Sequence, residues 1–197
     1  MLVTGLVVVT GDSKGKTTNA LGYALTALGL GKKVSMIQFQ KGGGYSGELF
    51  VKEHFAGLFE IKQFGGGCPI SEQIRSGELL CTKCGYCFRE NKNPANDFAR
   101  QALKYVWQNL QQREPAVLIL DEVSHAVNNS LIALTEVQEI IDFCRQTNKL
   151  LVLTGRRMPE PLIAQADIAT ECKMVKHPRR DQGIDARRVV TQLGKLD

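Results

Sequence analysis

The stretch that decides the fold reads Leu6-Val7-Val8-Val9-Thr10-Gly11-Asp12-Ser13-Lys14-Gly15-Lys16-Thr17-Thr18. The apolar, mostly β-branched run at 6–9 is typical of a buried parallel strand, and helix-forming residues follow the glycines at 17–28. A glycine-rich turn between a strand and a helix lets backbone N–H groups and the helix N-terminus bind phosphate. The stretch therefore predicts a phosphate-binding loop and, with it, nucleotide binding.

Individual residues of this loop have predicted parts in the site. Lys16 supplies a mobile positive charge, and the hydroxyl of Thr17 can ligate Mg²⁺. The expected ATP-binding residues are Gly11, Asp12, Ser13, Lys14, Gly15, Lys16, Thr17 and Thr18. The usual pattern has four residues between its glycines, whereas three separate Gly11 from Gly15. A loop that is one residue short indicates an unusual use of the motif.

A second site is expected where the segment Leu118-Ile119-Leu120-Asp121-Glu122 ends in two acids. An apolar strand that ends in a carboxylate places it at the carboxyl edge of a sheet, beside the phosphate loop. Asp121 is the candidate to hold Mg²⁺ directly or through water, and Glu122 is expected to join Thr17 and Asp121 in the Mg²⁺ site. In a hydrolase Glu122 would orient water, and the alternative is a strand end with two exposed acids.

Strand-like and helix-like segments alternate outward from these motifs. Further strands are predicted at 34–39, 59–64, 116–120, 150–153 and 167–170. One helix is predicted to begin at Asn93-Pro94, and apolar spacing predicts another over 131–144. The pattern predicts an α/β fold with a doubly wound, mostly parallel sheet of the P-loop NTPase (RecA-like) type. We expect a single domain over residues 1–197, interrupted by a Cys-rich insert at about 65–93.

Composition excludes several classes of protein. With 43% apolar and 23% charged residues among 197, the chain can bury a core, and it has no apolar run of the ~18–20 residues that a membrane span needs. We expect a cytoplasmic protein without a targeting segment or membrane contact. Residues 173–188 include six basic and two acidic side chains, which account for four of the five net positive charges. This local charge suits a phosphate-rich small molecule, nucleic acid or simply a solvated tail.

Four cysteines mark the insert as a candidate metal site. Cys81, Cys84 and Cys87 have C-x2-C-x2-C spacing, and Cys68 lies upstream. The spacing is compatible with a zinc knuckle, with iron–sulfur ligation or with no metal. A bound Zn²⁺ or cluster would help to order a long loop, because metal binding contributes folding free energy. Cys144 and Cys172 are predicted to be core thiols.

Motifs farther along the chain carry a family resemblance. Gln38-Phe39-Gln40-Lys41-Gly42, Thr154-Gly155-Arg156 and Lys176-His177-Pro178 follow the short phosphate loop in this order. Over residues 3–64 and 95–186 the chain resembles the ATP:corrinoid adenosyltransferases. The resemblance implies that the Co(I) of a corrinoid attacks the 5′ carbon of ATP and that triphosphate leaves. It implies catalytic roles for Lys16, Thr17, Asp121 and Arg156, with Lys41 and Arg156 binding ATP.

The resemblance also implies partners. The corrinoid would be cobalamin or cobyrinic acid a,c-diamide, a reductase or flavin would supply electrons, and the protein would be a homodimer. The chain departs from the family at Ser13, where Gly is usual, at Arg179, where an aromatic is usual, and at Gly67-Cys68-Pro69-Ile70, where aromatic residues usually lie near the corrin. How the corrin is held is therefore not carried over.

Two other functions fit parts of the sequence. Zinc-containing nucleoside kinases of the thymidine type also combine a phosphate loop, a D-E strand end and four cysteines, although normally as two C-x2-C pairs. An ATP-dependent nucleic-acid-binding module could use the cysteines and the basic tail, but the chain has no basic stripe interleaved with aromatics. Binding to nucleic acid is therefore not expected.

Overall fold

Six strands form one sheet in the computed structural model, which describes residues 4–43, 47–55, 57–76, 78–79, 84–176 and 181. The strands are β1 (Gly5–Thr10), β2 (Val34–Phe39), β3 (Phe59–Phe64), β4 (Val117–Asp121), β5 (Leu150–Thr154) and β6 (Ile168–Glu171). Their order is β3-β2-β4-β5-β1-β6, and every pairing is parallel. The prediction of a P-loop α/β fold is confirmed, and the described sheet is parallel throughout.

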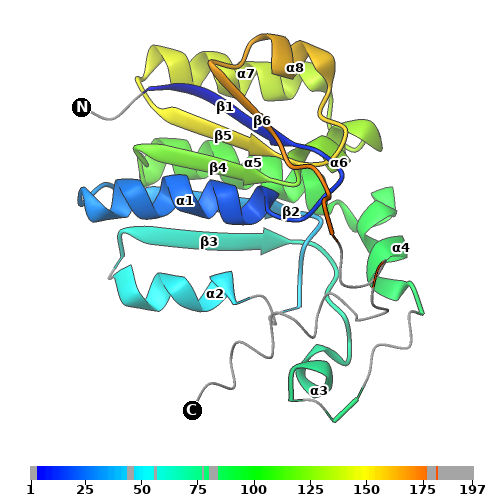
Figure 1. The fold of residues 1–197 in the computed structure, drawn as a ribbon. Helices are drawn as coiled ribbons and strands as arrows, with labels where there is room; N and C mark the ends of the chain where they lie inside the picture. The colour runs from blue at the N-terminus through cyan, green and yellow to red at the C-terminus, as the bar shows by residue number, and fades with distance from the viewer. Residues whose placement is uncertain are drawn as a thin grey trace.

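Helices cover both faces of this sheet (Figure 1). The described helices are α1 (Lys16–Gly29), α2 (Glu48–Val51), η1 (Lys52–Phe55), α3 (Ser71–Ser76), α4 (Tyr86–Lys92), η2 (Pro94–Asn96), α5 (Phe98–Gln112), α6 (Val123–Asn128), α7 (Leu134–Gln146) and α8 (Glu160–Ala164). Apolar residues of α1 and α2 pack on one face, and those of α5, α6 and α7 pack on the other. This arrangement is the predicted doubly wound sheet.

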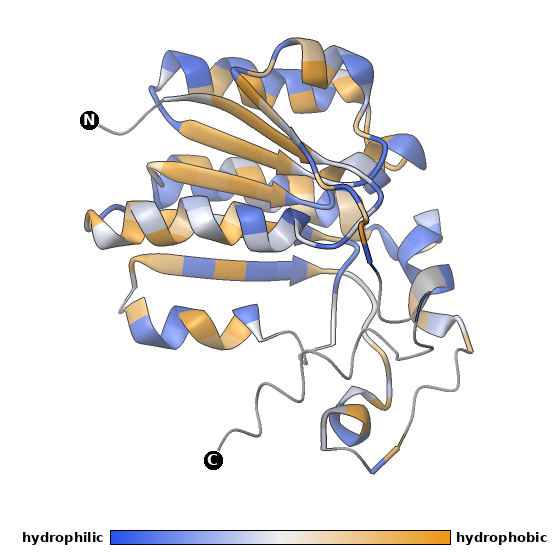
Figure 2. Cartoon of the chain, in the orientation of Figure 1, coloured by the Kyte–Doolittle hydropathy of each residue, from blue (hydrophilic) through white to orange (hydrophobic). Residues whose placement is uncertain are grey.

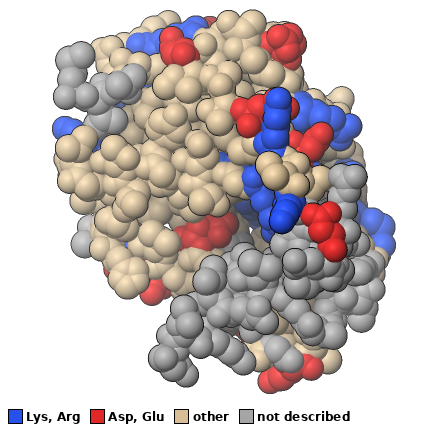
Figure 3. Space-filling model, in the orientation of Figure 1, with Lys and Arg blue, Asp and Glu red and all other residues tan. Residues whose placement is uncertain are grey.

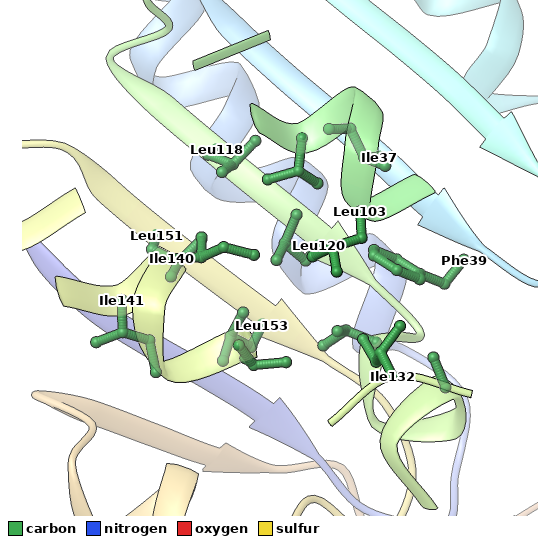
Figure 4. Close-up of a cluster of buried hydrophobic side chains, with 14 of the residues drawn as sticks. Ile37, Phe39, Leu103, Leu118, Leu120, Ile132, Ile140, Ile141, Leu151 and Leu153 are labelled. Atoms are coloured by element: carbon green, nitrogen blue, oxygen red, sulfur yellow. The ribbon is translucent and has the colours of Figure 1, made fainter. Parts of the chain in front are cut away.

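Alternating strand residues supply the two cores. Val7 and Val9 of β1 face α1, while Leu6 and Val8 face α7, and each is at most 2% exposed. Because a strand buried on both faces needs apolar residues at nearly every position, β1, β4 and β5 read as near-continuous apolar runs. Figure 2 shows these strands as the most hydrophobic part of the chain, and Figure 4 shows the larger cluster beneath α5 and α7.

Two helices begin later than the sequence predicted. The side chain of Asn93 accepts a hydrogen bond from the N–H of Ala95, but it caps only the short η2, and Asp97 at φ 52° separates this turn from α5. The second helix, α7, begins at Leu134 rather than at 131, where the N–H of Ala133 donates to Glu136. The left-handed backbone at Asp97 sets the start of α5, and the contact of Ala133 with Glu136 sets the start of α7; apolar spacing alone locates neither.

No helix in the described ranges is long and apolar enough to cross a membrane. The parallel strands all end at one edge of the sheet, called the carboxyl edge below. The phosphate loop follows β1, Lys41 follows β2, Asp121 ends β4, and Arg156 follows β5. The topology therefore brings the predicted site residues to the same edge.

Candidate active site

The phosphate loop rests on the chain that leaves β6. Gly11 has φ +106°, and a Cβ there would collide with the backbone of Cys172. The N–H of Ser13 donates to the carbonyl of Cys172 at 3.3 Å, and the N–H of Cys172 donates to the carbonyl of Thr10 at 2.8 Å. Strand β6 thus holds the loop on the side away from β5.

This position corrects one expectation about the cysteines. Cys172 is half-buried beside the phosphate loop and packs at the margin of the core under α1, so it is not a fully buried core thiol. Cys144 is, as predicted, a core residue of α7 at 1% exposure, and burial raises the pKa of its thiol to about 12. No pattern in the sequence indicates this position of Cys172, because it depends on backbone hydrogen bonds and on a strand pairing.

Lys16 lies under the loop with only 5% of its surface exposed. Its Nζ donates to the carbonyl of Gly11 at 2.8 Å and to the carbonyl of Ser13 at 2.5 Å. Burial lowers the pKa of the Lys16 ammonium. Both acceptors are loop carbonyls, so Lys16 can exchange them for phosphate oxygens without leaving a carboxylate unpaired. The exposed Asp12, Lys14 and Thr18 lie along the same loop and helix start.

Asp121 is the centre of the polar contacts at the carboxyl edge. Its carboxylate is fully buried, and Oδ1 accepts hydrogen bonds from Thr17 Oγ1 at 3.0 Å and Thr154 Oγ1 at 2.6 Å. Burial opposes ionisation of this carboxyl, but the Lys41 ammonium and the hydrogen bonds hold its pKa below the ordinary value. The predicted pair of Thr17 and Asp121 is therefore in direct contact, with an ionised carboxylate.

Lys41 supplies the positive charge beside this pair. Its Nζ lies 2.6 Å from Asp121 Oδ2 and 3.2 Å from Thr17 Oγ1. Burial alone would lower the pKa of Lys41, but Asp121 raises it. A cationic nitrogen between a hydroxyl and a carboxylate stands where a divalent cation with oxygen ligands would be held. The residues present therefore fit Mg²⁺.

Two glutamines orient Asp121, and the sequence analysis assigned them no role. Gln38 Nε2 donates to Asp121 Oδ2 at 2.9 Å and to Glu48 Oε1 at 3.2 Å. Gln63 Nε2 in turn donates to Gln38 Oε1 at 2.8 Å across the β2–β3 pairing. The available signal was Gln38 inside the strand 34–39, all of whose residues are buried, since a buried amide needs partners.

Glu122 follows Asp121 at the N-cap of α6, with φ 61°. Its N–H donates to Thr154 Oγ1 at 3.1 Å, which ties it to β5. Its Oε2 is buried without a hydrogen bond among the described residues and lies 3.7 Å from His125 Nε2. Glu122 thus has an acceptor oxygen free for water or for a hydrated cation.

Arg156 lies in a turn that α6 fixes from below. Ser124 Oγ donates to the carbonyl of Arg156 at 2.7 Å, and a Cβ on Gly155 would collide with Ser124. The side chain of Arg156 is exposed. Figure 3 shows Lys and Arg side chains, interspersed with Asp and Glu, on the side where the strands of Figure 1 end. The carboxyl edge therefore offers cations to a phosphate-rich ligand.

The loops after β2 and β3 cross in contact, through backbone atoms. A Cβ on Gly42 would collide with the carbonyl of Gly65, and one on Gly67 would lie 2.6 Å from Gly43 Cα. Asn91 of α4 holds the second loop, because its Oδ1 accepts the N–H of Gly66 at 2.7 Å. The start of the Cys-rich insert is thereby packed against the loop that carries Lys41.

The predicted metal site in the insert is not confirmed. In the parts of the chain that the structure describes, no group of three or more His, Cys, Asp or Glu side chains could hold a metal ion. Cys68, Cys84 and Cys87 are free thiols, and Cys81 lies outside the described residues. A Zn²⁺ or iron–sulfur site remains a prediction, and no step of the reaction is derived from it.

Part of the C-terminal motif also lies outside the described residues. These positions are His177, Pro178 and Arg179, together with most of the basic segment 173–188. Of that segment, Lys173 forms an exposed ion pair with Glu171 at 3.3 Å.

Comparison with solved structures supports the fold. The flagellar accessory protein FlaH from Methanocaldococcus jannaschii superposes with a TM-score of 0.58 at 13% sequence identity, over 88% of this chain and 73% of that one. At this identity the likeness concerns the arrangement of strands and helices.

Comparison of sequences identifies the family. A corrinoid adenosyltransferase from Escherichia coli strain K12 is 30% identical over 186 residues, which cover 92% of this chain and 82% of the relative. A corrinoid adenosyltransferase from Sinorhizobium sp. is 28% identical over 94% of this chain and 79% of its own. The kinase reading finds no support in these comparisons. The family described as ATP:corrinoid adenosyltransferase BtuR/CobO/CobP matches residues 4–191, and the chain belongs to this family.

Proposed function

We propose that the chain transfers the 5′-deoxyadenosyl group of ATP to the Co(I) of a corrinoid at the carboxyl edge and releases triphosphate. The observation that carries the proposal is the charge arrangement there. The Lys16 ammonium donates hydrogen bonds to loop carbonyls, and the Lys41 ammonium donates to both Asp121 and Thr17. Three cations, with Arg156 as the third, thus surround the place where a triphosphate would lie.

These residues stabilise the leaving group. When the bond between the 5′ carbon and the triphosphate oxygen breaks, that oxygen gains negative charge. Lys16, the loop N–H groups, Lys41 and Arg156 are placed to compensate the charge, and their fixed positions reduce the reorganisation that the reaction needs. The cobalt of the substrate is the nucleophile, so no side chain has to remove a proton.

Mg²⁺ would be held by the Thr17 hydroxyl and the Asp121 carboxylate, with Glu122 accepting a hydrogen bond from a water of its hydration shell. The ion supplies positive charge to the triphosphate. Lys41 now stands beside both ligands, 2.6 Å from Asp121 and 3.2 Å from Thr17. We infer that the Lys41 side chain moves toward the phosphates when Mg²⁺ and ATP bind. Its charge then pairs with the triphosphate instead of with Asp121.

The test is an assay with ATP, Mg²⁺ and a chemically reduced Co(I) corrinoid. Formation of a light-sensitive adenosylcorrinoid, followed by absorbance, together with stoichiometric triphosphate, is expected. Release of ADP or phosphate without an adduct would contradict the proposal. Lys104→Gln on α5 provides a control, because Lys104 is exposed and no hydrogen bond or ion pair of its side chain is seen among the described residues.

We further infer that a flavin or a reductase in the cytoplasm supplies the electrons that reduce the corrinoid. We also infer that the chain is a single domain and acts as a homodimer. The family resemblance supports both inferences.

A metal in the insert would be detected by elemental analysis of the purified protein. Zinc or iron in a 1:1 or higher ratio that disappears in Cys84→Ser supports the site, whereas metal-free, fully active protein contradicts it.

A further inference from the structure

A second basic pocket lies beside the ATP site, between α4 and α6. It encloses about 240 Å³ and is lined by Lys92, His125, Asn128, Asn129 and Arg157. The reaction described above uses none of these five residues. His125 Nε2 lies 3.7 Å from Glu122 Oε2, and Glu122 directly follows Asp121, so the pocket adjoins the reacting groups. Figure 1 shows α4 and α6 on the side where the strands end.

The backbone presents Arg157 to this pocket at a local cost. Arg157 has φ 48°, a left-handed conformation that is unfavourable for a residue with a Cβ. Asn128 Nδ2 holds it there by donating to the Arg157 carbonyl at 2.9 Å. Asn128 stands one helical turn after Ser124, which holds the carbonyl of Arg156. Ser124 and Asn128 of α6 thus fix the backbone of two consecutive arginines, Arg156 beside the ATP site and Arg157 beside the second pocket.

The free hydrogen-bond donors of the pocket are mainly cationic. The amide nitrogens of Asn128 and Asn129 are engaged with the carbonyls of Arg157 and His125, at 2.9 and 2.6 Å. Within the described ranges no carboxylate forms an ion pair with Lys92 or Arg157. Lys92, Arg157 and the imidazole therefore remain to bind a ligand, and charged donors of this kind bind carboxylates strongly.

We propose that this pocket binds a peripheral carboxylate of the corrinoid, so that the enzyme prefers a corrinoid whose side chains are not all amidated. The inference rests on the adenosyltransferase activity and adds the substrate class. The corrin must face the 5′ carbon of the bound ATP, and its edge, which bears acid or amide side chains, extends beyond the nucleotide toward the pocket beside Glu122. Two cations select the acid, because an uncharged amide gains less from them.

The experiment compares three corrinoids that differ at the periphery. Cobyrinic acid a,c-diamide carries free carboxylates, cobinamide carries amides, and cobalamin carries amides and one phosphodiester. Each is assayed as Co(I) for kcat and KM, and its Co(III) form is titrated against the protein by calorimetry in the absence of ATP. Arg157→Gln and Lys92→Gln remove one charge each, and Lys32→Gln removes an exposed charge at the opposite edge as a control.

The expected result is a rise of about three- to fivefold in KM and Kd for the diamide in each pocket variant, with kcat unchanged, since an exposed charge pair contributes up to about a fivefold change. Cobinamide should change by less than about twofold, and the diamide preference should weaken as salt is raised. Equal losses for diamide and cobinamide, or no loss for either, would overturn the proposal. A loss confined to cobalamin would overturn it in favour of phosphate recognition. Absence of transfer to every corrinoid by the native protein would instead contradict the reaction itself.

Discussion

Two polar clusters lie at opposite ends of the same sheet, and they differ in how their charges are paired. At the carboxyl edge, the buried Asp121 is paired with Lys41, whereas Lys16 donates only to loop carbonyls and the side chain of Arg156 is exposed. At the opposite edge, where the parallel strands begin (the amino edge below), both carboxylate oxygens of Glu60 in β3 accept hydrogen bonds. Oε1 accepts from Tyr105, and Oε2 accepts from Asn109 at 2.6 Å, with Arg113 Nε at 3.6 Å.

The difference distinguishes a site built for binding from a contact built for stability. Arg113 also donates to Ser35 at 3.2 Å and to the carbonyl of Gly57 at 2.6 Å, so the amino-edge cluster joins β2, β3 and α5. The pairing there is complete around Glu60 without a ligand. At the carboxyl edge, Lys16 and Arg156 form no ion pair with a carboxylate among the described residues, and a polyanion would supply their partner. Substitutions should therefore affect activity at one edge and stability at the other.

The largest effect is expected from Lys16→Ala. Adenosyl transfer should fall by at least about a hundredfold, because a preorganised cation on the leaving group is lost. The Tm should change little, since Lys16 donates only to loop carbonyls. Rates with Co(I) corrinoid and thermal unfolding without ATP check both statements. A normal rate, or a loss explained by unfolding, would remove the contrast between the two edges.

Lys41→Met should be an exception to this rule, because a substitution at the carboxyl edge should here lower stability. It leaves the buried Asp121 carboxylate without its cation, and we expect a loss of about 2–3 kcal/mol in unfolding free energy, less than for a fully buried pair because Lys41 is 27% exposed. In the native chain Asp121 has a lowered pKa, so its contribution is present above about pH 4 and is lost only as the pH falls below that ordinary value.

Urea unfolding between pH 3 and 7 measures this effect. The variant should begin to recover relative stability as the pH falls, because protonation then neutralises Asp121. The double variant Lys41→Met/Asp121→Asn should be more stable than the single one at pH 7. If both are equally unstable, the loss comes from packing of the Lys41 side chain and not from charge.

A smaller effect, confined to stability, is expected from Glu60→Gln. The substitution removes one acceptor and the charge, and we expect a loss of about 1–2 kcal/mol with unchanged kcat and KM. Glu53→Gln on η1 is the matched control, because Glu53 is exposed. Denaturant unfolding and the corrinoid assay give the two readouts. A fall in kcat for Glu60→Gln would show that the amino edge also serves the reaction.

The smallest effect is spectroscopic and concerns Tyr105. Burial, and then the hydrogen bond to Glu60, raise the pKa of its hydroxyl to about 12 from an ordinary value of 10.0. The stability that this residue provides is complete below pH 10 and is lost as the pH rises toward 12. An ultraviolet titration should show one tyrosine ionising late, and Glu60→Gln should move it to lower pH. Four tyrosines that titrate together would contradict this assignment.

The sequence predicted those features that depend on local pattern. Apolar runs located the six strands, and the loop that contains Lys16 and the acid at Asp121 were identified from residues next to one another. Features that depend on partners across the sheet were missed, such as Gln38 with Gln63 and Cys172 beneath the phosphate loop. The register of β2 on β3, which brings the two glutamines together, is fixed by the whole sheet.

The contact between the loops of Gly42 and Gly65 couples the motion of the Cys-rich insert to the motion of the loop that carries Lys41. Because the two backbones touch, neither loop can open fully while the other stays closed. The amides at 41–43 and 65–68 should exchange with solvent as one cooperative unit. ATP bound at Lys41 would then slow hydrogen exchange in a loop that the nucleotide never touches, and the insert would report on the occupancy of the site.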